Sequence, residues 1–268
     1  MSTAFIEVLR DLWAFVITKP VVSDSSESVL LLPETSPPAT QTPKTPPPLK
    51  ASFSLESRVG YVTQSAVRCL QVPQKKFDTL RGLFTYGEAV KVIQQKDQWS
   101  FVESAVVQGW VESKYLTDDK KAVFPQLNSG QTYGANNPET KKLRQYLNDE
   151  LLGGLLGLPL QPTEFATYQL RRLAIEVAWP LERPRLPGMW QSILSGKRGI
   201  AIGREPKTGS VLETTSGPKQ FLAFVESVTP DDSLVISCIG RQQEGVYEKT
   251  ECTRAQWFEW KPVFISFT

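Results

Sequence analysis

The sequence predicts an α+β protein in which an N-terminal helix and a linker precede two folded parts. Three observations predict this organisation. A long stretch rich in proline, serine and threonine separates the first residues from the rest of the chain. Short runs of β-branched and aromatic residues follow, a composition that strands favour. A helical start at Pro138 then opens the remainder of the sequence.

Composition narrows the function before any motif is considered. The chain has 268 residues and no histidine, which removes the commonest general base and the most frequent metal ligand. Ser-His-Asp and Cys-His-Asn catalysis are therefore excluded. Its three cysteines are widely spaced and cannot complete a zinc site alone, so we expect no metal and no cofactor. The net charge of +2 is evenly mixed and argues against a nucleic-acid surface.

Residues 1–19 are predicted to form a short amphipathic helix that Pro20 ends. Its apolar face would carry Phe5, Val8, Leu9, Leu12, Trp13 and Val16. Charged residues interrupt the apolar run, so we expect neither a signal-peptide core nor a membrane span, which needs ~20 apolar residues. Two roles stay open: docking on a protein, or lying on a membrane surface with Trp13 and Lys19 at the interface. Two acids and one base on the polar face favour protein docking.

Residues 20–52 are predicted to be a disordered linker. Serines are followed by prolines interleaved with threonines, and proline makes up 20 of the 268 residues, above the usual ~5%. Such a segment buries too little apolar surface to offset the entropy of ordering it, and proline keeps it extended. A spacer is the favoured interpretation, and a proline-rich ligand for a partner domain is the alternative.

Residues 53–118 are predicted to form a small β-barrel. Five short strand-like runs lie in this region: Y-V-T, A-V-R-C-L, E-A-V-K-V-I, W-S-F-V-E-S and Q-G-W-V-E. Pro73, Gly87 and Gly109 punctuate them. So many short strands fit a barrel better than an open sheet, because closure removes exposed edges.

The order of landmarks in this unit resembles a bacterial SH3-like (SH3b) domain. A strand precedes Pro73, Gly87 precedes a valine-rich strand, and the unit closes on the phrase G-W-V-E-S-K-Y-L. Leu70 departs from the pattern, because the family usually has arginine there. The resemblance implies binding of peptidoglycan stem peptides or a spacer role, with three candidate contacts: Trp99, Trp110 and Tyr115. The alternative is that both tryptophans belong to the barrel core, and for Trp110 we favour it.

A shorter connection over residues 118–135 leads to a predicted helix that starts after Asn137, with Pro138 in its first turn. The pairs Lys75-Lys76 and Lys120-Lys121 are interpreted as solvated loop charges. Residues 136–268 are predicted to form one domain.

From Leu158 onward, the order of features resembles the CHAP family of cell-wall amidases and endopeptidases. Five phrases carry the likeness: L-P-L-Q-P-T-E-F-A-T-Y-Q-L (158–170), G-M-W-Q-S-I-L (188–194), E-P-K-T-G-S-V (205–211), F-L-A-F-V-E-S-V-T-P-D-D-S-L-V-I-S (221–237) and T-R-A-Q-W-F-E-W-K-P-V-F-I-S-F (253–267). The resemblance implies a papain-like α+β domain, with a nucleophile-bearing helix packed on an antiparallel sheet.

The catalytic positions implied by this resemblance are all replaced. Pro162 stands where the family has its nucleophilic cysteine, and Phe221 stands where it has histidine. Cys238 occupies the place of the acid or amide that orients the histidine. Proline has no nucleophilic atom and phenylalanine cannot accept a proton. Cys238, in an apolar strand context, is expected to be an inert buried thiol.

The resemblance therefore implies a non-catalytic protein that uses an old hydrolase fold for binding or scaffolding. The ligand would be peptidoglycan or a protein partner, with Tyr168 and Trp190 as candidate groove-wall residues, although the core is the favoured place for each. A structural subunit of an envelope, secretion or phage assembly is a variant of this hypothesis, and the compartment stays open. The alternative function is a cell-wall hydrolase that works without cysteine and histidine, for which Glu164 and Glu226 are candidate acids.

Overall fold

The computed structural model describes residues 57–75, 79–148, 157–179, 186–214 and 220–268. All the described residues belong to one compact unit, Phe53–Thr268. The predicted helix 1–19 and the predicted linker 20–52 lie outside the described residues.

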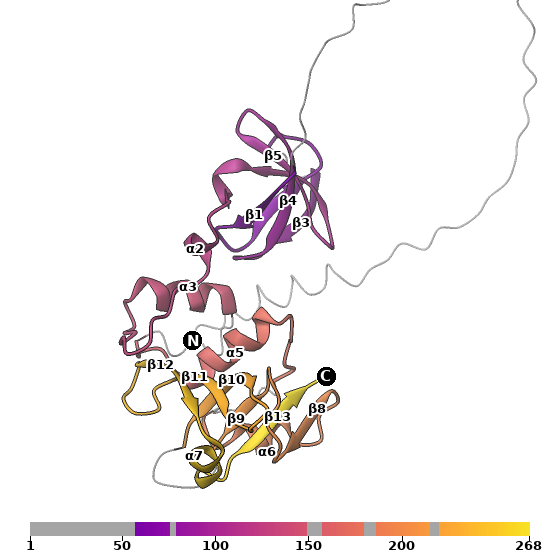
Figure 1. Ribbon diagram of the computed structural model, residues 1–268. Helices are drawn as coiled ribbons and strands as arrows, with labels where there is room; N and C mark the ends of the chain where they lie inside the picture. The colour runs from indigo at the N-terminus through magenta and orange to yellow at the C-terminus, as the bar shows by residue number, and fades with distance from the viewer. Residues whose placement is uncertain (1–56, 76–78, 149–156, 180–185, 215–219) are drawn as a thin grey trace, which may run out of the picture. The chain divides into compact units, whose positions relative to one another are not determined.

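The first part of the described chain forms a seven-stranded antiparallel sheet with the order β3-β2-β6-β5-β4-β1-β7 (Figure 1). Its strands are β1 (Arg58–Val62), β2 (Val67–Leu70), β3 (Leu80–Phe84), β4 (Ala89–Lys96), β5 (Trp99–Glu103), β6 (Gln108–Glu112) and β7 (Leu116–Thr117), with a 3₁₀ turn (η2, Ser113–Tyr115) before β7. All five predicted runs lie in strands, namely β1, β2, β4, β5 and β6. Strands β3 and β7 were not predicted.

One face of this sheet builds a valine-rich core. Alternate residues of β4, β5 and β6 point into it, as the period of two in a strand requires. The buried members are Val62, Val67, Cys69, Phe84, Val90, Val92, Val102 and Val111. Gly109 is required where β6 crosses β2, because a Cβ there would lie 2.6 Å from the Leu70 carbonyl oxygen and 2.7 Å from Cys69 Sγ. Strands β2 and β6 therefore lie too close together at this point to leave room for a side chain at position 109.

Helices α2 and α3 lie in the part of the chain between β7 and α5 (Pro162–Arg172). The short helix α2 (Lys120–Val123) begins where the Asp119 side chain accepts a hydrogen bond from the Lys121 amide. The longer helix α3 (Pro138–Leu147) confirms the predicted start after Asn137, whose side chain caps the Glu139 amide at 2.8 Å. Lys120 and Lys121 thus lie on a helix, whereas the sequence placed them in a loop.

The second part of the described chain forms a six-stranded antiparallel sheet with the order β12-β11-β10-β9-β13-β8. Its strands are β8 (Ile200–Gly203), β9 (Val211–Glu213), β10 (Leu222–Val228), β11 (Leu234–Ile239), β12 (Tyr247–Cys252) and β13 (Val263–Phe267). The predicted central hairpin is β10 and β11, which pair from Ala223–Cys238 to Val228–Leu234. The predicted closing strand is β13, which pairs with β9 and β8.

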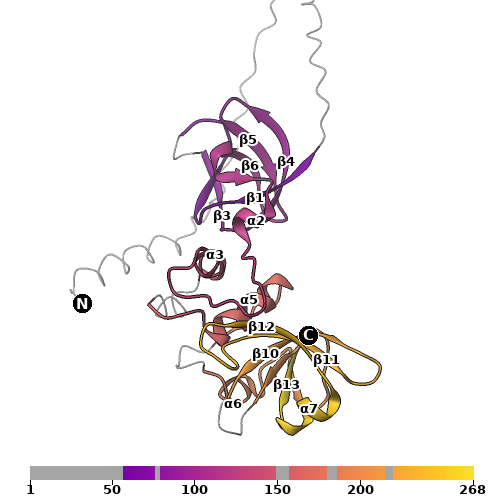
Figure 2. The same ribbon diagram turned by 60° about the vertical axis from the view of Figure 1, so that its left-hand side comes forward.

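Helices cover both faces of this sheet (Figures 1 and 2). On one face, α5 (Pro162–Arg172) and α6 (Trp190–Leu194) share a core with Leu222 and Phe224 of β10. On the other face, α7 (Arg254–Glu259) packs through Trp257 against Ala223 and Val225. Consecutive β10 residues therefore enter different cores, as expected for a strand covered on both sides.

The structure confirms a mixed α+β chain with two antiparallel sheets and few helices. Closure of the first sheet into a barrel stays a prediction, because the strand order runs from one edge strand, β3, to another, β7. Among the described residues, no helix has the length and hydropathy that crossing a membrane requires.

Candidate functional site

The N-terminus of α5 carries a structural arrangement rather than a nucleophile. Pro162 is the first residue of this helix, and its ring lies 3.6 Å from where a Cβ on Gly240 would stand. The Glu164 carboxylate accepts a hydrogen bond from the Gln161 amide at 2.9 Å, completing a capping box. Arg144 of α3 donates to the same carboxylate, from Nε to Oε1 at 2.6 Å and from Nη2 to Oε2 at 3.0 Å. This end of α5 is therefore occupied by a buried, bidentate ion pair.

Phe221 and Cys238, the other two positions that the CHAP resemblance singles out, lie together on the far face of the sheet from α5. Both belong to the core that α7 covers, and the Phe221 ring meets Trp260 edge to face at 5.4 Å. Burial raises the pKa of the Cys238 thiol to about 12, and Glu248 adds to the effect. The structure thus places Cys238 as an inert buried thiol, and it puts Phe221 and the body of α5 on different faces.

The two candidate acids do not form a catalytic pair. Glu164 has no exposed side-chain surface, and Arg144 holds both of its oxygens. Glu226 instead accepts hydrogen bonds from Ser237 Oγ at 2.6 Å and from Gln169 Nε2 at 3.5 Å. Glu164 lies on α5 itself, and Gln169, the α5 partner of Glu226, lies five residues further along, about 7.5 Å along the helix axis. Each carboxylate therefore has its own structural partners.

A cleft of about 600 Å³ opens along one stripe of α5. Phe165, Tyr168, Gln169 and Arg172 line it at the i, i+3, i+4 and i+7 spacing that puts residues on one helix face. Tyr168 is only 3% exposed and meets Tyr146 of α3 edge to face at 5.5 Å. The floor of this cleft is therefore aromatic.

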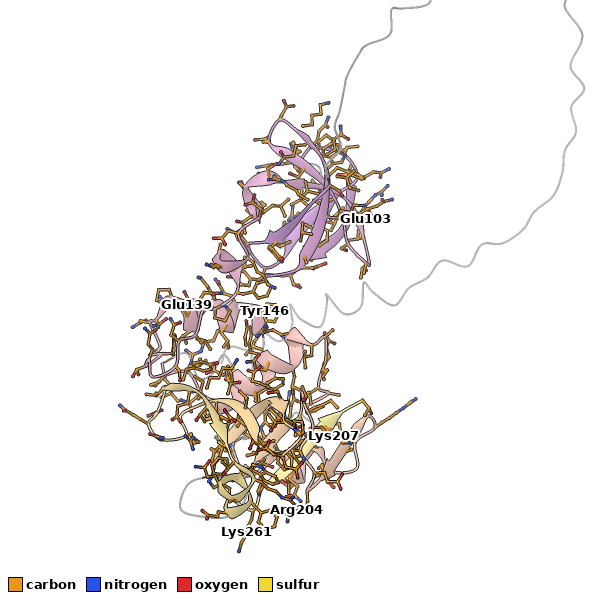
Figure 3. All side chains as sticks on the ribbon, in the orientation of Figure 1. Glu103, Glu139, Tyr146, Arg204, Lys207 and Lys261 are labelled. Atoms are coloured by element: carbon orange, nitrogen blue, oxygen red, sulfur yellow. The ribbon has the colours of Figure 1, made fainter. Side chains whose placement is uncertain are left out.

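The rim of the same cleft is cationic. Lys120 and Lys121 of α2 line it together with Arg172, and no acidic residue is among the lining side chains. The segment that carries these lysines, residues 120–126, is held against α3. Lys142 Nζ donates to the Lys121 carbonyl at 2.9 Å, and Glu139 accepts from the Gln126 amide at 2.6 Å. Glu139 and Tyr146 lie toward opposite ends of α3 (Figure 3). The cleft thus brings together segments that the sequence separates widely.

Burial raises the pKa of the Tyr168 hydroxyl above its usual range, and it raises the pKa of Tyr247, which also lines the cleft, to about 12. Both phenols are therefore neutral near pH 7 and can donate a hydrogen bond. Of the two predicted groove residues, Tyr168 lines the cleft. Trp190 does not, because it is fully buried against Trp179 with ring centroids 4.6 Å apart.

A second pocket, of about 370 Å³, lies on the seven-stranded sheet. Trp99 and Tyr115 line it, with Lys75, Arg68 and Glu112 around them. The structure thus brings two of the three predicted SH3b contacts together.

The third predicted contact, Trp110, is half-buried and packs edge to face on Phe101 at 5.3 Å. It lines neither of the two pockets described above and lies outside the valine-rich core that we favoured for it.

Sequence reasoning missed the cationic rim because it interpreted the Lys120-Lys121 pair as solvated loop charge and did not relate it to Arg172. The α5 stripe from Phe165 to Arg172 was a usable signal, since its spacing already places an arginine and a tyrosine on one face. Across the described ranges, no group of three or more histidine, cysteine, aspartate or glutamate side chains could hold a metal ion.

The sequence matches no known protein family and no curated protein. Among solved structures, the chain is similar to an N-acetylmuramoyl-L-alanine amidase from Staphylococcus aureus, with a TM-score of 0.33 and 17% sequence identity. The similar region covers 40% of this chain and 31% of the amidase chain, so it spans less than a third of that protein. A similarity of this size carries no argument about function.

Proposed function

We infer that this chain is a non-catalytic binding or scaffolding protein whose C-terminal domain derives from a papain-like cell-wall hydrolase. The observation that carries this proposal is the start of α5, where Pro162 takes the place of a nucleophile and a buried Arg144–Glu164 pair fills the space behind it. Neither proline nor an ion-paired carboxylate can begin acyl transfer.

Binding is supported by the surfaces that stay open. The cleft beside α5 and the pocket at Trp99 and Tyr115 each combine aromatic faces with charged or amide groups. Such a combination suits peptides and sugars, which offer both apolar and polar edges. We take residues 53–118 as an SH3b-like barrel and residues 136–268 as the hydrolase-derived domain. Peptidoglycan, through its stem peptides, is the ligand that this combination favours, and a protein partner is the alternative.

A hydrolase without cysteine and histidine gains no support from the site. Glycan cleavage needs two carboxyl groups facing one substrate, one of them able to donate a proton. Glu164 is sealed by Arg144, and Glu226 is bonded to Ser237.

Purified peptidoglycan sacculi test both parts of the proposal in one experiment. The full chain is incubated with sacculi, and the pellet is assayed for retained protein while the supernatant is assayed for released fragments. We expect retention without release. Soluble fragments would contradict the non-catalytic assignment, whereas the absence of both would exclude peptidoglycan and direct attention to a co-purifying protein.

The Trp99 pocket can be tested in the same assay with a matched pair of variants. Tyr115→Ala removes an aromatic wall of the pocket, and Phe101→Ala removes an aromatic side chain of the same sheet that does not line it. Weaker retention of the first variant alone would assign sacculus binding to the pocket. Equal retention of both would place binding elsewhere on the chain.

A further inference from the structure

We propose that the cleft beside α5 is a binding site for a short anionic peptide, which it holds by its carboxylates. This inference rests on the proposed binding function and deepens it, because it names the ligand class and the residues that select it. The site is the aromatic cleft with the rim formed by Lys120, Lys121 and Arg172.

Charge is the first argument. The whole chain is nearly balanced, with 30 basic and 28 acidic residues, yet the lining of this cleft carries three cations and no acid. Among the described residues, none of these cations forms an ion pair: Lys120 lies over the Phe124 ring at 5.5 Å, and Arg172 bonds the neutral amide oxygen of Gln169 at 3.1 Å. Uncompensated positive charge around one concave surface favours an anionic ligand.

The nearest acids are already engaged. Glu139 is paired with Lys142 at 3.0 Å and also accepts from the Gln126 amide. Glu226 is bonded to Ser237 and Gln169. Neither lines the cleft, and each is bonded to side chains other than the three cations of the rim.

The Tyr168 hydroxyl supplies the second, independent argument. Tyr168 lines the cleft, its hydroxyl makes no hydrogen bond to the described residues, and this oxygen is not one of the buried atoms left without a partner. The hydroxyl is therefore accessible from the cleft and can donate a hydrogen bond to a ligand. Arg172 lies 5.8 Å from the centre of the Tyr168 ring, so a carboxylate at this point could meet a cation and a phenol together.

Size and the character of the floor select a peptide among anions. The cleft of about 600 Å³ falls within the range that holds drug-sized ligands and exceeds what a lone inorganic ion needs. Phe165 and Tyr247 add aromatic floor that a phosphate ion would leave uncovered. A short peptide offers apolar side chains to the floor and carboxylates to the rim.

The test is isothermal titration of the full chain with a tetrapeptide of one glutamate and three alanines that has a free C-terminus. We expect saturable binding that weakens as ionic strength rises, and about tenfold or greater loss with the glutamine analogue whose C-terminus is amidated. Inorganic phosphate is titrated in parallel. Phosphate binding as tight as the peptide would overturn the peptide assignment.

Matched variants locate the binding. Lys120→Gln/Lys121→Gln/Arg172→Gln should weaken peptide binding about tenfold or more, whereas Lys141→Gln/Lys207→Gln/Lys249→Gln removes the same charge from exposed positions outside the cleft and should leave it unchanged. Tyr168→Phe, which removes only the unpartnered hydroxyl, should weaken it about tenfold. Equal affinity in both triple variants would refute the site.

Sacculus retention separates this inference from the proposed function. If sacculi retain the chain but the tetrapeptide does not bind, the cleft assignment fails and the general binding role stands. If the tetrapeptide binds at the cleft but sacculi do not retain the chain, the cleft stands and peptidoglycan fails as the ligand.

Discussion

Glu164 is a candidate catalytic acid whose contacts indicate a structural role. A carboxylate on the helix that the CHAP resemblance singles out suggests chemistry, but this one is fully buried and bonded to Arg144 and to the Gln161 amide. We expect Glu164→Gln to lower the free energy of unfolding by about 3–5 kcal/mol, because it leaves the Arg144 guanidinium buried without a counter-charge. Urea unfolding at neutral pH measures the difference.

The control for this substitution is Glu205→Gln, an exposed glutamate, which should change stability by less than ~0.5 kcal/mol. Replacing both partners, as in Arg144→Met/Glu164→Leu, should recover much of the loss, since an apolar pair of similar volume removes the desolvation cost. A Glu164→Gln protein as stable as the parent would show that the pair contributes no net stability.

The buried thiols give stability a dependence on pH. Burial raises the pKa of Cys69 from 9.0 to about 11 and that of Cys238 from 9.0 to about 12. The folded chain therefore holds these protons more tightly than the unfolded chain does. The contribution is fully present below pH 9 and is lost as pH rises toward 11–12, so we expect the free energy of unfolding to fall above pH 9.

Urea titrations between pH 7 and pH 10.5 measure this fall. Cys238→Ala should reduce the slope of the free energy of unfolding against pH by about 1.4 kcal/mol per pH unit, which corresponds to one proton. An unchanged slope in that variant would mean that other buried groups, namely Cys69 or the buried tyrosines, set the dependence rather than Cys238.

Among the elements, β10 decides whether a cysteine and a histidine placed at the positions that the CHAP resemblance singles out could meet. Leu222 and Phe224 point to α5, whereas Phe221 and Ala223 belong to the core on the α7 side. We expect Pro162→Cys/Phe221→His to contain no activated thiol, because an imidazole at position 221 would face away from the body of α5. The measurement is the rate of iodoacetamide alkylation against pH, compared with Pro162→Cys alone.

The two profiles should coincide, with the same midpoint. A shift of the double variant to lower pH would mean that histidine and cysteine meet, and it would reverse the placement of Phe221. Circular dichroism of each variant excludes loss of the fold as the cause of a difference.

The elements themselves were predicted unevenly, for identifiable reasons. Strand β4 carries valine at alternate positions, β5 and β6 each hold a valine and a tryptophan, and Asn137-Pro138 is a strong helix start, so these elements were found. Strand β3 holds Gly82 at its centre, and the edge strand β12 (Y-E-K-T-E-C) has charged residues at three of its six positions. Local composition argued against both, and pairing with a neighbouring strand overrode it.

At the scale of the whole molecule, the candidate site could be predicted only in part. Tyr168 was identified from its helix, but its neighbours come from a distant connection and from α3. Lys120 and Lys121 reach the rim of the cleft only because the fold brings α2 to the same cleft as α5. No local sequence pattern encodes this contact between distant segments. Trp190 lies in the core, which was the favoured interpretation, but its motif alone does not reveal whether an aromatic residue faces a groove or a core.

The arrangement of cores predicts how the molecule unfolds. The seven-stranded sheet has its own valine-rich core, whose members all come from residues 62–111, and the six-stranded sheet has two cores drawn from residues 133–265. No side chain is shared between the two sets. Because each core is complete within its own segment, we expect a fragment of residues 53–118 to fold alone and unfold cooperatively.

Thermal unfolding of that fragment, followed by circular dichroism, tests the expectation against the full chain. A fragment this small is marginal in buried area, so a midpoint below that of the full chain is expected. The aromatic contact Tyr61–Phe124, with ring centroids 5.6 Å apart, links the first sheet to the connection and is absent from the fragment. If Phe124→Ala in the full chain lowers the transition of the first sheet toward the fragment's midpoint, that contact accounts for the difference. A fragment without a cooperative transition would mean instead that the two sheets fold as one unit and that the predicted boundary at residue 118 is wrong.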